Sequence, residues 1–275
     1  MTVHDSALAV EARAVTKRFV TRDGTVDALD RVDVAVGPGE FVCLVGPSGC
    51  GKSTLLNIIA GLIAPTAGEV LIDGRTVVGP PAEVGVMFQS AVLLEWRTVR
   101  ANVLLPIELR DGRKAAERMR ATADELLAMA GLAGFEARYP SELSGGMQQR
   151  VAICRMLIAR PDVLLLDEPF GALDELTREH MNVELASICA RAAAAAVFVT
   201  HNIQEAVFLS DRVYVMSARP GRVVGAVDVD LERARDLDIV TTPAFQALVR
   251  QVRTLLNVGA DGLGIRRASR REAVG

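Results

Sequence analysis

A glycine-rich segment at residues 46–54 constrains this chain more than any other feature. It reads Gly-Pro-Ser-Gly-Cys-Gly-Lys-Ser-Thr and fits the phosphate-loop pattern G-x-x-x-x-G-K-[ST]. The apolar run 41–45 before it predicts a strand, and the periodic run 55–60 after it predicts a helix. Strand, loop and helix in this order are the context that the pattern requires.

The residue types in this loop suit the binding of a phosphate chain. Glycines let several backbone N–H groups point at one phosphate, and the following helix directs the positive end of its dipole there. Lys52 would add a charge near the β- and γ-phosphates, and the Ser53 hydroxyl could ligate Mg²⁺. The alternative is a glycine-rich turn that binds nothing. We predict a nucleoside-triphosphate site made of Gly46, Pro47, Ser48, Gly49, Cys50, Gly51, Lys52, Ser53 and Thr54.

A second glycine-containing segment opens a predicted amphipathic helix near residue 145. Ser144 occupies the expected N-cap position, and Gly145 and Gly146 follow it. Met147 stands where a capping box would have Glu or Gln, so no carboxylate reaches back. The first turn is then bare backbone with one hydroxyl, which predicts a second anion site. The alternative is an ordinarily capped surface helix.

Two acidic residues follow a continuous apolar run at 163–166. That run predicts a strand buried on both faces of a parallel sheet, and Pro169 ends it. Asp167 would lie at the carboxyl end of the strand, where ligands bind in open α/β sheets. There it could hold Mg²⁺, while Glu168 could polarise an attacking water. The alternative is a pair of acids in a solvated turn.

Two further candidates depend on their place among these motifs. A predicted strand at 195–200 delivers His201 to the same sheet edge, although a single His in such a place is more often structural than catalytic. Gln89 follows the apolar run 84–88 and carries almost no signal alone.

Taken in order, these motifs resemble the ATP-binding-cassette (ABC) ATPases. The resemblance implies ATP as the substrate, catalytic roles for Glu168, His201 and Gln89, and Mg²⁺ bound through Ser53, Gln89 and Asp167. Phe19 falls at the position of an aromatic ring that stacks on adenine, and its alternative is a core Phe at a strand edge.

The same resemblance implies an ATP-dependent homodimer of two copies placed head to tail. Asp174 would lie in the loop that crosses to the second copy. The γ-phosphate held by one copy would face four residues of the other, namely Ser144, Gly145, Gly146 and Gln148.

A second, less specific resemblance is to one group of ABC ATPases, those of the nitrate, sulfonate and taurine importers. It is carried by residues 85–89, 93–99, 102–103, 205–213 and 216–222. Glu95 departs from that pattern, where Pro is usual, and Asn202 departs where Asp is usual. The group implies a peripheral subunit on the cytoplasmic membrane face, contacting a membrane permease near residues 89–102. A periplasmic or extracellular solute-binding protein would be an indirect partner. An exporter or lipid-pump ATPase, or a non-transport cassette, remains as the alternative.

Composition agrees with this class. No apolar run approaches the roughly 20 residues of a membrane span, and no secretion signal opens the chain. A net charge of −3 does not indicate the basic surface that is typical of proteins that bind nucleic acid. The cysteines show no metal-ligand spacing, which predicts reduced thiols, and Cys50 in the phosphate loop suggests a point sensitive to thiol reagents.

The expected fold class is α/β, a phosphate-loop NTPase of the ABC type. By resemblance it has a RecA-like mixed or parallel sheet core, an N-terminal antiparallel β subdomain and an inserted α-helical subdomain over about residues 98–160. We expect one nucleotide-binding domain over 8–225, a C-terminal helical appendage over 226–258 and a mobile tail over 259–275. Residues 21–25 predict a hairpin turn.

Overall fold

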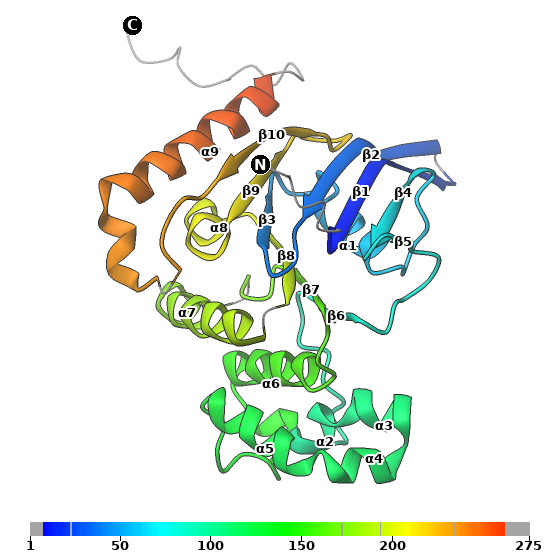
Figure 1. The fold of residues 1–275 in the computed structure, drawn as a ribbon, viewed down its shortest axis with the longest axis vertical. Helices are drawn as coiled ribbons and strands as arrows, with labels where there is room; N and C mark the ends of the chain where they lie inside the picture. Colours follow the sequence, from blue (N-terminus) through cyan, green and yellow to red (C-terminus); the bar gives the residue numbers. More distant parts are fainter. Residues whose placement is uncertain (1–7, 23, 172, 193, 234, 262–275) are drawn as a thin grey trace, which may run out of the picture.

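The computed structural model describes residues 8–261, with the exception of residues 23, 172, 193 and 234. Two sheets form the upper part of the molecule in Figure 1, and a group of helices forms the lower part. Within the chain so described, no helix combines the length and the apolar character that crossing a membrane would take.

The first sheet is antiparallel and comes from the N-terminal part of the chain. Its strand order is β2-β1-β4-β5, and every neighbouring pair is antiparallel. Thr21 pairs with Gly24, so the predicted hairpin is confirmed. The strands are β1 (Val10–Thr21), β2 (Gly24–Val36), β4 (Ala67–Ile72) and β5 (Arg75–Thr76).

The second sheet forms the centre of the molecule, with strand order β10-β9-β3-β8-β7-β6. All neighbours are parallel except β10, which runs antiparallel to β9. The predicted mixed or parallel core is therefore confirmed. Its strands are β3 (Phe41–Val45), β6 (Val84–Met87), β7 (Val163–Asp167), β8 (Ala195–Thr200), β9 (Arg212–Met216) and β10 (Val223–Asp228).

Both faces of this sheet are covered, which is why β3 and β8 are buried along their whole length. Side chains alternate between the faces. Val42 and Leu44 pack with α1 (Lys52–Ile59) and the antiparallel sheet. Cys43 and Val45 pack in the opposite core, which α7 (Glu175–Ala192), α8 (Ile203–Leu209) and α9 (Pro243–Asp261) help to form.

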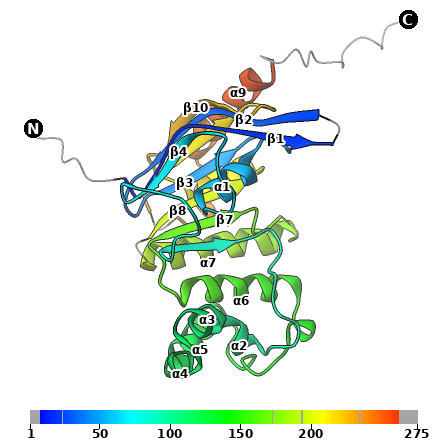
Figure 2. The same cartoon turned by 90° about the vertical axis from the view of Figure 1, so that its right-hand side faces the viewer.

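The lower part of the molecule is the inserted helical subdomain, and it has a core of its own (Figures 1 and 2). Val99, Val103, Leu127 and Val151 are fully buried there. The subdomain leaves the sheet after β6 and returns to it at β7. Its helices are α2 (Val99–Val103), α3 (Leu105–Asp111), α4 (Arg113–Arg118), α5 (Arg120–Met129), the short 3-10 helix η1 (Pro140–Glu142) and α6 (Gly145–Leu157).

The C-terminal part differs from the expected helical appendage over 226–258. Residues 226–228 belong to β10, where Val227 is buried between two exposed neighbours, the period-two pattern of a strand. No helix lies between 229 and 236 in the portion that is described. The 3-10 helix η2 (Leu237–Thr241) comes next, and α9 extends three residues past the expected end, to Asp261. The predicted tail from 262 onward lies outside the described residues.

Candidate nucleotide-binding and catalytic site

The phosphate loop connects β3 to α1, as its sequence predicts. Gly51 caps α1 with φ 104°, and a Cβ on it would lie 2.6 Å from Leu29 Cδ2, so only glycine fits. Lys52 is 5% exposed, and its Nζ donates to the carbonyl oxygens of Gly46 at 2.9 Å and Pro47 at 3.2 Å. The loop thus holds one ammonium group inside its own curve.

Cys50 contributes backbone to this loop but no accessible thiol. The residue is 1% exposed, and burial raises the pKa of its thiol. Its Sγ lies 3.9 Å from Lys52 Nζ. This burial contradicts the hypothesis that Cys50 is readily attacked by thiol reagents. All four cysteines are free and buried.

Ser53 and Asp167 meet where α1 begins and β7 ends. Ser53 Oγ donates to Asp167 Oδ1 at 2.9 Å. Burial raises the pKa of the Asp167 carboxyl. A hydroxyl and a carboxylate are oxygen ligands of the kind that Mg²⁺ takes. Among the described residues no group of three His, Cys, Asp or Glu side chains could hold a metal ion.

Glu168 and His201 follow the ends of two neighbouring parallel strands, β7 and β8. Glu168 Oε2 lies 3.2 Å from His201 Nδ1. The Glu168 backbone has φ 43°, a left-handed conformation that costs free energy in a residue other than glycine, and its N–H donates to the Val199 carbonyl at 2.9 Å. The turn after β7 therefore holds this carboxylate in a defined place beside the imidazole.

Gln89 follows β6 and reaches the same edge of the sheet. A Cβ built on Gly171 would lie 3.7 Å from Glu168 Oε2 and 3.8 Å from Gln89 Nε2, so both polar groups face that glycine. Gln89 is exposed, and its backbone carbonyl oxygen accepts a hydrogen bond from Gln149 Nε2 at 3.0 Å. Gln89, Asp167, Glu168 and His201 thus gather at one sheet edge.

The helix that carries the second glycine motif begins as predicted. Ser144 is the N-cap of α6, and its Oγ accepts a bond from Met147 N at 3.3 Å. A Cβ on Gly145 would meet no atom within 4 Å, whereas Gly146 is buried and a Cβ on it would lie 3.6 Å from Thr177 Cγ2, so the first turn is open at Gly145. Gln148 turns away to donate to the Pro140 carbonyl at 3.0 Å. No hydrogen bond recorded for the described part of the chain joins residues 144–148 to the phosphate loop.

Asp174 and Asn202 are both helix caps in this structure. Asp174 accepts bonds from Thr177 N at 3.0 Å and Thr177 Oγ1 at 2.8 Å at the start of α7, and the backbone bond lowers the pKa of its carboxyl. Asn202 Oδ1 accepts bonds from the first N–H groups of α8, at 2.9 and 3.2 Å. Asn202 therefore caps the helix that follows His201. Ala172, two residues before Asp174 in the predicted partner loop, lies outside the described residues.

Phe19 is exposed on β1. Its side chain is 37% exposed, and Lys17 Nζ lies 5.1 Å from the centre of its ring. The alternative of a core Phe at a strand edge is wrong for this position, because the residue is exposed.

Sequence reasoning missed the residues that hold the segment after Gln89. Arg155 of α6 donates to the carbonyl oxygens of Ala91 and Val92, both at 2.7 Å. Asn102 is fully buried and donates to three carbonyl oxygens between residues 94 and 98 while it accepts from Leu94 N. The sequence shows that Asn102 and Arg155 are polar residues within predicted helices. It does not show that their side chains point inward, so it could not predict these bonds.

These bonds leave part of the segment exposed. Trp96 is 75% and Val92 is 56% exposed, whereas Leu93 packs between the sheet core and the helical core. Leu93 is therefore packed internally, whereas Trp96 lies on the surface.

With this geometry established, comparison with known proteins decides the family. The sequence model described as ABC transporter matches residues 29–171. The chain belongs to the ABC transporter family. An uncharacterized ABC transporter ATP-binding protein of Methanocaldococcus jannaschii is 51% identical over 222 residues, which are 81% of this chain and 82% of that protein.

Two other relatives of this ABC protein carry more specific names. The taurine import ATP-binding protein of Rhizobium johnstonii is 47% identical, with 88% of this chain and 94% of that protein aligned. The nitrate import ATP-binding protein of Synechocystis is also 47% identical, with 81% and 83% aligned.

A solved ABC cassette has the same fold. It is a dimeric ATP-binding cassette in a post-hydrolysis state with ADP and phosphate, and it is similar with TM-score 0.72 and 35% identity. The superposed region includes 81% of this chain and 100% of that cassette. The ABC protein described here is therefore a nucleotide-binding ATPase with the α/β cassette fold.

Proposed function

We propose that this ABC ATPase is the energy-coupling subunit of an importer for a small solute of the nitrate, sulfonate or taurine group. One observation carries the proposal. Relatives named as import ATP-binding proteins for taurine, aliphatic sulfonates and nitrate align with this chain over 94%, 94% and 83% of their own lengths. Similarity so nearly end to end favours a shared role over a shared domain alone.

In this proposal residues 46–54 bind the phosphates of ATP, and Phe19 stacks on the adenine. The position of Lys52 supports its part, because its ammonium lies within the loop, bonded to two loop carbonyls. Ser53, Asp167 and Gln89 would hold Mg²⁺. When bound, the ion neutralises charge on the β- and γ-phosphate oxygens.

Glu168 is the proposed general base, and His201 is its neighbour at the γ-phosphate. The 3.2 Å contact between them supports this pairing, because an Nδ1–H tautomer would donate to the carboxylate and orient both groups. The fixed turn after β7 keeps the carboxylate at the sheet edge, where an attacking water would be oriented.

The ATP site is proposed to be completed by a second copy of the chain. Ser144, Gly145, Gly146 and Gln148 of one copy would face the γ-phosphate held by the other, and Asp174 would lie in the crossing loop. The exposed start of α6 at Ser144 and Gly145 supports this role, because the N–H groups and dipole of a helix N-terminus favour an anion. The similar solved cassette is dimeric, which agrees with this arrangement.

A membrane permease is the proposed partner of residues 89–102. Exposed Trp96 and Val92 offer apolar contact surface there. The same segment contains Gln89, and Gln149 and Arg155 of α6 donate to the Gln89 and Val92 carbonyls, so contact with a permease would reach the catalytic edge. The subunit would then lie on the cytoplasmic face of the membrane, and a solute-binding protein would act on it indirectly. No nucleic acid partner is proposed.

The test is a pull-down from gently solubilised membranes with Mg-ATP, using tagged Glu168→Gln protein to prolong the ATP-bound state. Lys52→Ala, which is expected to bind ATP poorly, is the control. We expect a multi-span permease in the Glu168→Gln sample and its depletion in the control. A soluble ATP-dependent dimer without a membrane partner would contradict the importer role and leave the ATPase. Capture of an exporter or lipid pump would contradict import while keeping transport.

A further inference from the structure

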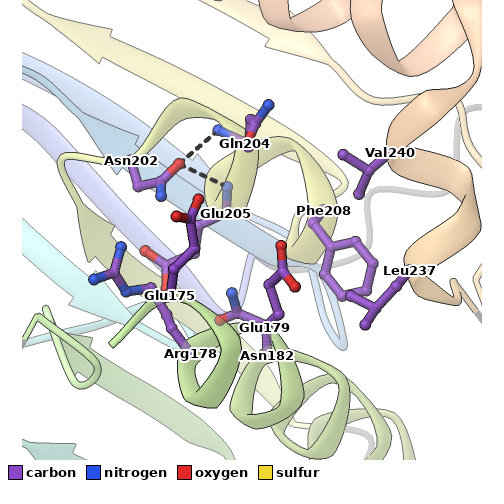
Figure 3. A pocket seen from close by; sticks show the side chains of 10 residues that line it. All are labelled: Glu175, Arg178, Glu179, Asn182, Asn202, Gln204, Glu205, Phe208, Leu237 and Val240. Atoms are coloured by element: carbon purple, nitrogen blue, oxygen red, sulfur yellow. Dashed lines mark hydrogen bonds between the residues drawn. The ribbon is translucent and has the colours of Figure 1, made fainter. Parts of the chain in front are cut away.

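The short helix α8 begins two residues after His201 and is held at both ends. At its start, Asn202 Oδ1 accepts bonds from the N–H groups of Gln204 and Glu205 (Figure 3). At its end, Arg235 Nη1 donates to the carbonyl oxygens of three residues that close the helix, at distances of 3.0, 2.8 and 2.9 Å. They are Val207, Phe208 and Ser210.

Arg235 is suited to this second contact by its charge and its setting. A cation at a helix C-terminus binds the last carbonyl groups and interacts favourably with the helix dipole. The guanidinium is itself fixed, because Nη2 donates to the Leu231 carbonyl and Nε to the Glu232 carbonyl, both at 3.2 Å. The segment that carries Arg235 is therefore attached to the end of α8.

A further set of bonds ties α8 to the residues on each side of His201. Thr200 Oγ1 donates to the Glu205 carboxylate and accepts from Asn202 N at 3.0 Å. Glu205 lies on α8 and is 6% exposed. His201 thus stands between two residues that are both bonded to this helix, so the orientation of α8 sets the place of the imidazole.

Apolar contacts add to this attachment on the same side. Leu237 and Val240 of η2 line the pocket that also contains Phe208 of α8, opposite the first turns of α7 (Figure 3). All of these C-terminal residues lie beyond 29–171, the part of the chain that the family model matches. The expectation that this region is only a packing appendage leaves the bonds of Arg235 to α8 unexplained.

We propose that Arg235 is a positioning residue for ATP hydrolysis. It holds the C-terminal end of α8, so that His201 at the other end remains against Glu168. This inference rests on the proposed role of His201. It predicts that loss of the guanidinium lowers the rate of hydrolysis while leaving nucleotide binding by the phosphate loop intact.

The test compares kcat and KM for ATP in Arg235→Gln, Arg235→Lys and the control Arg233→Gln. Arg233 lies in the same segment, but it binds Asp211 and the Gly39 carbonyl instead of α8. We expect Arg235→Gln to lower kcat about tenfold with KM unchanged, because small misplacement of a catalytic group slows a reaction strongly. Arg235→Lys should recover part of the loss, since an ammonium still donates to carbonyl oxygens. Arg233→Gln should keep the wild-type kcat.

A second comparison separates positioning from stability. Arg235→Gln is also made in a His201→Ala background, and single-turnover rates are measured with protein in excess of ATP. We expect no further loss there, although the midpoint of thermal unfolding should shift equally in both backgrounds. An equal loss of rate in both backgrounds, or a wild-type kcat in Arg235→Gln alone, would overturn the inference. Full activity of His201→Ala alone would instead overturn the proposed role of His201. Should Arg235→Gln not fold, Arg235→Lys takes its place, and the same outcomes decide.

Discussion

Ser53 Oγ lies 2.9 Å from Asp167 Oδ1, although 114 positions separate the two residues in the chain. The contact follows from the strand order, in which β8 alone stands between β3 and β7, so the loops after β3 and β7 open at one edge of the sheet. A hydroxyl from a helix start and a carboxylate from a strand end are thereby brought together at the phosphate loop.

This contact predicts how hydrolysis responds to Mg²⁺. Ser53→Ala and Asp167→Asn should each raise the Mg²⁺ concentration that gives half-maximal turnover, because the first removes an oxygen ligand and the second removes the charge of the carboxylate. Steady-state ATPase assays over a Mg²⁺ titration at fixed ATP measure the shift. Thr76→Ala, an exposed position on β5, serves as the control. An unchanged Mg²⁺ requirement in both variants would argue against an ion at this pair.

Glu168→Gln should reduce turnover by about 10²–10⁴-fold, the range for loss of one general base. ATP should still bind, so the variant is expected to accumulate as an ATP-dependent dimer. Steady-state turnover and size-exclusion chromatography with and without Mg-ATP measure the two effects. Glu179→Gln, an exposed carboxylate on α7, is the control. Near-normal turnover in Glu168→Gln would remove this residue from the proposed mechanism.

Asn102→Ala should lower the free energy of unfolding by about 3 kcal/mol, because it removes the buried amide that bonds the Leu94 N–H and the Arg97 carbonyl and leaves both backbone groups without that partner. Asn102 is fully buried and makes four hydrogen bonds to the segment 94–98. Urea unfolding curves measure the loss. Gln251→Ala, an exposed change on α9, should have almost no effect. Equal stability of the two variants would mean that these bonds contribute little.

Glu205 predicts a dependence of stability on pH. Burial raises the pKa of its carboxyl in the folded chain above the ordinary value of 4.5, while the Thr200 hydroxyl bond opposes this in part. Its favourable contribution is thus complete below pH 4.5 and is lost as the pH rises through the folded pKa. Glu205→Gln cannot ionise, so its stability relative to the wild type should increase from pH 4.5 upward.

Urea unfolding of Glu205→Gln and wild type between pH 4.5 and 8 tests this expectation, with exposed Glu179→Gln as the matched control. The difference in unfolding free energy between Glu205→Gln and wild type should grow with pH, and that for the control should stay flat. A constant difference for Glu205→Gln would show that this carboxyl is equally easy to ionise in the folded and unfolded chains.

Much of the site could be predicted because its signals are local. The pattern at 46–54, the Ser144 cap and the acidic pair after an apolar run each occupy a few adjacent residues, and each obeys a short-range rule of backbone geometry. The strands of the central sheet were visible for the same reason, as continuous apolar runs. Strand β10 was missed because its outer face is exposed, and a half-exposed strand next to helical sequence has no such run.

By itself, the sequence determined the chemical identity of the site, because a phosphate loop, a cap and a carboxylate are defined by residue type and short spacing. Only the tertiary structure decided which side chains support that chemistry. Gln149, Arg155 and Arg235 act on backbone carbonyls far away in the chain, and such bonds have no sequence pattern. Burial likewise decided that the thiol of Cys50 is enclosed, because exposure depends on the packing of neighbouring segments and not on the residue alone.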